Sequence, residues 1–110
     1  MKVFVAGHNG LVGSEVTKLL RQQGHEVVVA NRSELDLRNR QDVFAFIGAN
    51  RPESVVIAAA VVGGIKANME RPVDFLSNNL QIQTNLIDAC HEYVVEKVVF
   101  LGSSCIYPKL

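Results

Sequence analysis

The chain has 110 residues, 48% of them hydrophobic, and its 11 basic and 11 acidic side chains give a formal net charge of zero. This length predicts one domain (residues 1–110) with a single core, and the balanced charge excludes the basic or acidic surface of a protein that binds nucleic acid or an anionic membrane, so we expect a small-molecule partner. Two cysteines are too few for a disulfide framework, and neither a signal-like start nor an apolar run of some 18 residues is present, so we expect a cytoplasmic protein.

An apolar strand over residues 2–6 leads into three glycines with the spacing G-x-x-G-x-x-G. The unbroken apolar run suits a central parallel strand that is buried on both faces. The glycines allow a sharp turn, a close backbone approach to a pyrophosphate and tight packing of the next helix on the sheet. The first backbone amides of that helix favour anions. A purely structural strand–turn–helix connection is the alternative. We favour a dinucleotide cradle formed by Gly7, His8, Asn9, Gly10, Leu11, Val12 and Gly13.

The periodicity predicts a helix from about residue 11 to residue 23, ended by Gly24, and then a second strand over residues 27–30. An NAD site places an acid directly after that strand, whereas an NADP site avoids the acid and supplies donors for the 2′-phosphate. This sequence has Asn31, Arg32 and Ser33 there, and Arg32 offers a planar fork of charged donors. The segment therefore predicts NADP (NADPH) as the cofactor. The alternative is that Arg32 is only a solvated loop residue.

The next residues lead to a third strand. Asp36 either caps a short helix over residues 39–47 or borders an adenine pocket together with Leu37. After the third strand, residues 54–58, the small side chains of Ala58, Ala59 and Ala60 let the backbone approach a ligand; packing of these alanines under a helix is the alternative.

The rest of the chain predicts a long helix over residues 72–93 and a fourth strand over residues 97–101. The helix carries two apolar stripes, one through Leu80 and Ile87 and one through Ile82 and Leu86, so it needs two surfaces to pack against. Alternating strands and helices with right-handed crossovers predict an α/β fold, a Rossmann-type doubly wound parallel sheet of about four strands in the order 3-2-1-4 with helices on both faces. The residues after the fourth strand lie at the ligand edge, and their hydroxyls are candidates for catalysis.

Three blocks of the sequence resemble the extended short-chain dehydrogenase/reductase family. They are Ala6-Gly7-His8-x-Gly10-x-Val12-Gly13, Ala58-Ala59-Ala60-x-Val62-Gly63-Gly64-Ile65 and Leu101-Gly102-Ser103-Ser104-Cys105-Ile106-Tyr107-Pro108-Lys109. The last two are the more specific, and within the family they are similar to NADP-dependent enzymes that epimerise and reduce GDP-4-keto-6-deoxy-mannose to GDP-L-fucose. The resemblance covers the whole chain, but the family runs to roughly three times this length.

The resemblance implies roles for individual residues. Ser103 matches the catalytic serine that polarises the C4 carbonyl, Cys105 matches the acid/base thiol of epimerisation, and Arg32 matches a ligand of the NADP phosphate. Leu101, Gly102 and Ser104 are assigned to the cofactor site, and no metal site is expected. Asn9 departs from the family, which commonly has an arginine there, so the preference for NADP is expected to be weaker. The resemblance also implies a GDP-sugar substrate and a homodimer through the helix 72–93.

The family's Tyr-x-x-x-Lys pair would fall after residue 110. Tyr93 and Lys97 have the right spacing, but the long helix places Tyr93 at the opposite edge of the sheet and Lys97 in a strand, so we exclude them. We therefore expect the 110-residue chain alone to be inactive. The alternatives are a stand-alone NADP-binding or regulatory module without catalysis, and another nucleotide-sugar epimerase or reductase.

Overall fold

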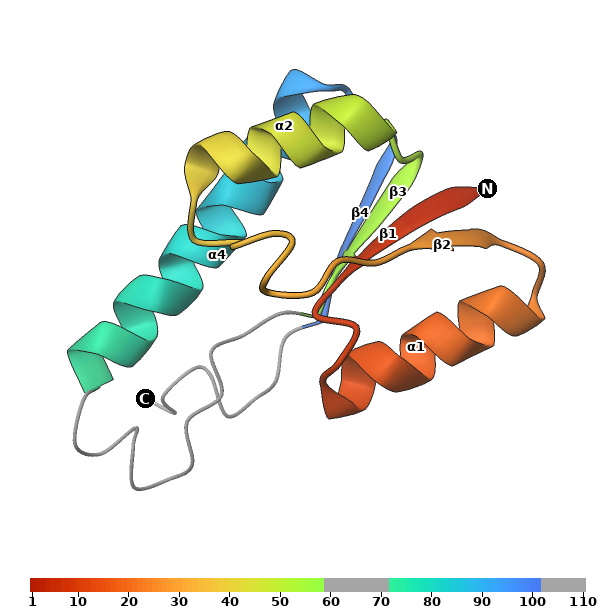
Figure 1. The fold of residues 1–110 in the computed structure, drawn as a ribbon, viewed down its shortest axis with the longest axis horizontal. Coiled ribbons are helices and arrows are strands. Elements are labelled where there is room, and N and C mark those ends of the chain that lie inside the picture. The colour runs from red at the N-terminus through yellow and green to blue at the C-terminus, as the bar shows by residue number, and fades with distance from the viewer. Residues whose placement is uncertain (59–71, 102–110) are drawn as a thin grey trace.

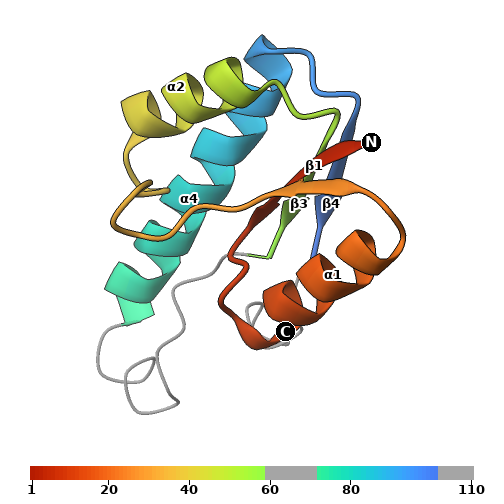
Figure 2. The same cartoon turned by 45° about the vertical axis from the view of Figure 1, so that its right-hand side comes forward.

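The computed structural model describes residues 1–58 and 72–101. In this part of the chain one parallel sheet has the strand order β2-β1-β3-β4. Helix α1 lies on one face of the sheet, and α2 and α4 lie on the other (Figures 1 and 2). The doubly wound parallel sheet with helices on both faces is thus confirmed. The elements in chain order are β1 (Lys2–Ala6), α1 (Leu11–Gln22), β2 (Glu26–Val28), α2 (Arg40–Asn50), β3 (Ser54–Ile57), α4 (Pro72–Glu92) and β4 (Lys97–Phe100).

The strand order differs from the predicted order 3-2-1-4. Strand β3 pairs with β1 on the side opposite β2, with Val3 facing Ser54 and Ala6 facing Ile57. The physical reason is burial: all four residues of β3 are buried, whereas β2 begins with the exposed Glu26. An edge position for β3 would leave an apolar strand open to water, so it lies between β1 and β4 and the more polar β2 takes the edge.

The alternation of side chains along β1 divides the core into two layers. Phe4 and Ala6 point to the layer under α2 and α4, and Val3 and Val5 point to the layer under α1. Both layers are closed by apolar side chains of the helices, among them Leu86 of α4 in the first layer and Leu20 of α1 in the second. Strand β1 is therefore covered on both faces, as its apolar run predicts.

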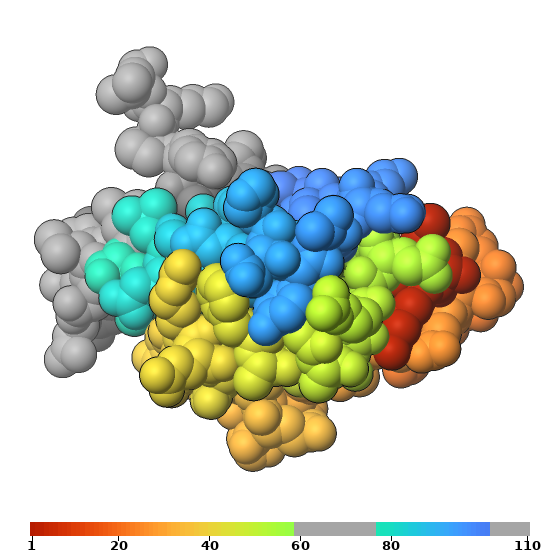
Figure 3. All heavy atoms as spheres, turned by 90° about the horizontal axis from the view of Figure 1, so that it is seen from above, coloured from red at the N-terminus to blue at the C-terminus, as the bar shows by residue number. Residues whose placement is uncertain are grey.

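Helix α4 meets two surfaces inside the domain. One of its apolar stripes, which includes Ile82 and Leu86, is buried against the sheet and against α2. Figure 3 shows α2 and α4 lying directly against each other along the molecule. In the other predicted stripe Cys90 is buried, whereas Leu80 and Ile87 form an open stripe, at 59% and 49% exposed.

Several boundaries differ from the prediction. Helix α2 continues through Gly48 to Asn50, and Arg51 ends it in the left-handed conformation with φ 47°. Its N-cap is Asn39, whose side chain accepts the Asp42 backbone N–H, so the alternative that Asp36 caps this helix is wrong. Strand β2 ends at Val28, two residues before the predicted end, whereas Gly24 follows α1 with φ 86° as expected for a helix terminator. Within residues 1–58 and 72–101, no helix has the length and apolar character needed to cross a membrane.

Candidate functional site

The carboxyl ends of β1 and β3 form a topological switch point. From β1 the chain runs toward one edge of the sheet, where β2 lies. From β3 it runs toward the opposite edge, where β4 lies. The backbone N–H of Ala58 donates to the carbonyl oxygen of Ala6 at 2.9 Å, which places Ala58 beside the start of the glycine turn. Ligands of open parallel sheets bind in the crevice at such a point.

The glycine turn is tightly constrained by its own backbone. Gly7 has φ 91°, a conformation that favours glycine, and its carbonyl oxygen accepts the Gly10 N–H at 3.2 Å. A Cβ on Gly13 would overlap the Gly7 carbonyl oxygen and lie 2.8 Å from the Gly7 carbonyl carbon. A Cβ on Gly10 would meet only that oxygen, at 3.5 Å. Gly13 is thus required by the fold, whereas the space in front of Gly10 is open.

The N-terminus of α1 has no side-chain cap of its own. Gly10 occupies the N-cap position with φ −73° and ψ 168°, and the first turn of α1 has no acidic residue. Helix α2 offers a direct contrast, because the Asn39 side chain accepts one of its first amides at 3.1 Å. The amides at the start of α1 therefore fit the phosphates of a dinucleotide, which would complete the hydrogen bonding of a helix start.

The segment after β2 lies beside the turn. The Asn9 side-chain Nδ2 donates to Asn31 Oδ1 at 3.4 Å, which joins the turn to the end of β2. The Asn31 backbone N–H donates to Glu34 Oε1 at 3.1 Å, and Arg32 and Ser33 form the exposed tip between them. Sequence reasoning missed Glu34, although a glutamate three residues after Asn31 has the spacing at which its side chain can accept the Asn31 N–H.

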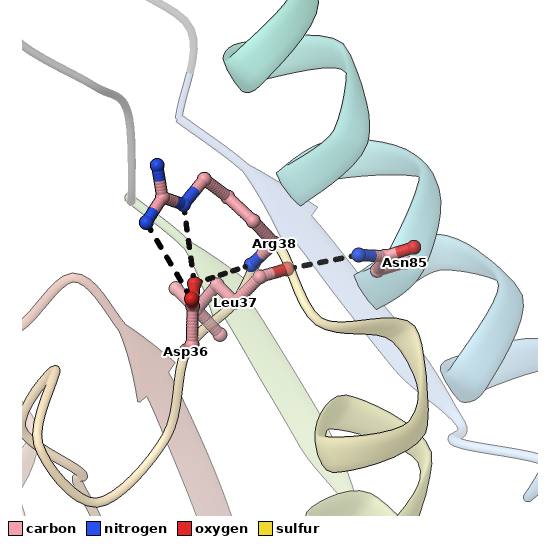
Figure 4. Close-up of polar contacts among 4 residues, drawn as sticks. All are labelled: Asp36, Leu37, Arg38 and Asn85. Carbon is pink, nitrogen blue, oxygen red and sulfur yellow. Dashed lines mark hydrogen bonds and ion pairs between the residues drawn. The ribbon is translucent and has the colours of Figure 1, made fainter.

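Asp36 and Arg38 form a second local unit further along this segment. The Arg38 backbone N–H and Nε donate to Asp36 Oδ1 at 3.0 and 3.2 Å (Figure 4). These hydrogen bonds from Arg38 hold the pKa of the Asp36 carboxyl below its usual value. Asp36 is therefore an acceptor for its own turn and is not the cap of α2.

The structure brings most of the described candidates together at one edge of the sheet. The turn from Gly7 to Gly13, the segment from Asn31 to Leu37, and Ala58 all follow the carboxyl ends of β1, β2 and β3. Leu101 follows β4 and donates its N–H to Ile57 O at 3.0 Å. The remaining candidates lie outside the described residues: Ala59, Ala60, Gly102, Ser103, Ser104 and Cys105.

Tyr93 lies away from this edge. Its ring contacts the Arg51 guanidinium, 4.8 Å from the ring centroid, and Arg51 directly follows α2 and precedes β3. A Cβ on Gly48 would come within 2.7 Å of the same ring. The exclusion of Tyr93 from the ligand edge is thus confirmed, and its role is to pack the far ends of α2 and α4 together.

A family model described as the NAD dependent epimerase/dehydratase family matches residues 3–110. GDP-L-fucose synthase 1 of Arabidopsis thaliana is 52% identical over 109 residues, which cover 98% of this chain and 34% of that protein. GDP-L-fucose synthase of Escherichia coli (strain K12) is 48% identical over 110 residues, with 99% and 34% covered. The chain therefore spans about a third of the length of these relatives.

The fold is also similar to solved structures. MlghC, a GDP-mannoheptose C4 reductase from Campylobacter jejuni with NADP bound, superposes with a TM-score of 0.89 at 38% identity. The similarity covers 97% of this chain and 34% of that chain. The resemblance identified from the three sequence blocks is thus confirmed at the level of the family.

Gly13 and Gly10 should differ in how much an alanine at their position lowers stability. Gly13→Ala should lower the free energy of unfolding by about 1–3 kcal/mol, because the new Cβ overlaps the Gly7 backbone. Gly10→Ala should lower it by less than about 1 kcal/mol, the usual effect of alanine at an N-cap. Urea unfolding of both variants measures the difference, and equal stabilities would contradict the close approach of Gly13 to Gly7.

Proposed function

Because the chain belongs to the NAD dependent epimerase/dehydratase family, we propose that it is the NADP-binding portion of a GDP-L-fucose synthase. In this proposal the complete enzyme epimerises and reduces GDP-4-keto-6-deoxy-mannose to GDP-L-fucose. The observation that supports cofactor binding is the uncapped start of α1 at the switch point between β1 and β3. The choice of substrate rests on the similarity to proteins that bear this name.

NADP is proposed over NAD because of the side chains at the tip after β2. Arg32 and Ser33 are exposed there, and no acid stands in the position that would bond a ribose 2′-hydroxyl. The two nearby carboxylates already accept hydrogen bonds from the chain, Glu34 from Asn31 and Asp36 from Arg38. These observations support Arg32 and Ser33 as the proposed ligands of a 2′-phosphate, and MlghC, to which the chain is similar, has NADP bound.

In this proposal the residues of the chain have separate roles in cofactor binding and in catalysis. The backbone amides at the start of α1 bind the pyrophosphate, and Arg32 and Ser33 bind the 2′-phosphate. Bound NADPH supplies a hydride for the C4 carbonyl of the sugar. By resemblance, Ser103 donates a hydrogen bond to that carbonyl oxygen, and Cys105 exchanges protons with the sugar during epimerisation.

There are two alternatives to this proposed function. One is a stand-alone NADP-binding or regulatory module, which would need the cofactor site at the start of α1 but no catalytic residues. Another nucleotide-sugar reductase is compatible with the 38% identity to a GDP-mannoheptose C4 reductase. A continuing reading frame with a Tyr-x-x-x-Lys pair would favour the enzyme over the module. The cytoplasmic location stays a prediction.

The proposed dimer would use the open stripe of α4. Leu80 and Ile87 are exposed apolar side chains of this helix. Val98 and Phe100 of β4 are 42% and 39% exposed, and they share the sheet face of their partners Val55 and Ile57, the face that α4 covers. Pairing of two α4 helices about a two-fold axis would remove the open stripe from water.

The first test of this proposal is cofactor preference. Calorimetric titration of the chain should show tighter binding of NADPH than of NADH. Arg32→Ala should reduce that preference by on the order of tenfold, since one charge-assisted bond is lost. Arg21→Ala, a change of the same kind in the last turn of α1, serves as the control. Equal affinities for the two cofactors before mutation would rule out the NADP assignment.

The second test is turnover. The purified 110-residue chain should bind NADPH but should not oxidise it with GDP-4-keto-6-deoxy-mannose, since a general acid contributes about 10²–10⁴-fold and the family's Tyr-x-x-x-Lys pair is not among these residues. The absorbance of NADPH at its reduced-nicotinamide band follows the reaction. Measurable oxidation that depends on the sugar would overturn this expectation.

The third test is the oligomeric state. Sedimentation velocity at tens of micromolar should show a dimer, and Ile87→Glu should shift it to a monomer by placing a charge in the open stripe. Leu19→Glu on α1, where Leu19 is 55% exposed, is the matched control and should leave the dimer intact. A monomeric wild-type chain would refute dimerisation, and a dimer that survives Ile87→Glu would assign the contact to another surface.

A further inference from the structure

The segment between β2 and α2 is anchored close to both of its ends. Near β2, the Asn31 carbonyl oxygen accepts the N–H groups of Glu34 and Leu35, both at 2.9 Å, and the Leu35 side chain is only 5% exposed. Near α2, the Asn39 N–H donates to Asp36 O at 2.9 Å, directly before the helix. The residues between these anchors, Asp36–Arg38 (the 36–38 turn), are therefore held in one place along the carboxyl edge of the sheet.

A side chain from a distant part of the sequence also holds this turn. Asn85 of α4 is 6% exposed, and its Nδ2 donates to the Leu37 carbonyl oxygen at 3.0 Å. Figure 4 shows the Asn85 side chain reaching from α4 toward this carbonyl, while the Arg38 side chain folds back onto Asp36. The bond spans 48 residues of sequence, so it joins α4 to the ligand edge directly.

Asn85 is a buried polar residue of α4, as is Asn79. Its buried neighbours Ile82, Leu86 and Ala89 are apolar and pack in the core, where an amide is costly unless it is hydrogen-bonded. An apolar side chain of the same size would fill the position without that cost. The presence of an amide at this buried position is therefore explained by its hydrogen bond to the backbone of the 36–38 turn.

The turn lies on the adenosine side of the proposed site. In doubly wound sheets the residues that follow the second strand contact the ribose of the adenosine half. The 36–38 turn continues the same backbone from Arg32 and Ser33. We propose that Asn85 is a positioning residue for the adenosine half of the dinucleotide: through Leu37 it fixes the 36–38 turn as one wall of that subsite. This inference rests on the proposed dinucleotide function.

The test compares two asparagines that make the same kind of bond. Asn85→Leu removes the donor to Leu37 O, and Asn50→Leu removes the donor to Phe46 O, a 2.9 Å bond at the far end of α2. The probe is 2′,5′-ADP, the adenosine half of NADP, titrated by calorimetry beside NADPH. Asn85→Leu should weaken both ligands by the same factor, about three- to tenfold, whereas Asn50→Leu should change neither. An equal factor for the fragment and the whole cofactor assigns the loss to the adenosine half when circular dichroism shows the variant to be fully folded, because a smaller folded fraction would also weaken both ligands equally.

A measurement on the unmodified chain removes the dependence on how well the variant folds. Titration with 2′,5′-ADP should shift the NMR signal of the Asn85 side-chain amide and leave that of Asn50 in place. An unmoved Asn85 signal, or a folded Asn85→Leu variant that binds 2′,5′-ADP as tightly as the unmodified chain, would overturn the positioning role. A chain that binds neither NADPH nor 2′,5′-ADP would instead refute the proposed function.

Discussion

The close approach of Gly13 to Gly7 is the constraint on which the site depends. No Cβ fits between the first turn of α1 and the carbonyl of Gly7, so the helix start lies directly against the end of β1. Thr17, one turn further along α1, is also buried, and its hydroxyl donates to Gly13 O within the helix at 2.8 Å. The N-terminus of the helix thereby points to the switch point. Gly10 has no side chain to cap the first amides of the helix, so these amides can bind a ligand.

The strand order determines which other segments lie beside the contact between Gly13 and Gly7. Placing β3 next to β1 brings Ala58 beside the glycine turn, and it sends the crossover from β2 over the face that α4 also covers. Helix α4 is then close enough for Asn85 to reach the Leu37 carbonyl. Burial of Cys90 in the same layer raises its pKa to about 11, so this thiol stays neutral and serves packing rather than chemistry. The core and the ligand edge are thus parts of one arrangement.

The sequence predicts the elements better than their arrangement. Apolar runs and Gly24 locate the strands and the end of α1, because these signals are local. The position of β3 depends on a partner about 50 residues away in sequence, and a local pattern does not identify that partner. The apolar run of residues 55–57 was a usable signal, since such a strand does not suit an edge. Glu34 was recognisable from its spacing to Asn31, whereas the bond from Asn85 to Leu37 joins segments 48 residues apart and follows from the packing of α4 alone.

A crystal structure of the chain with NADPH bound tests the central claim most directly. We expect the pyrophosphate to lie on the backbone amides at the start of α1, in front of Gly10, with the 2′-phosphate between Arg32 and Ser33. The adenine should lie on the side of the 36–38 turn. A cofactor bound elsewhere on the chain, or one whose 2′-phosphate faces away from Arg32, would contradict the proposed site.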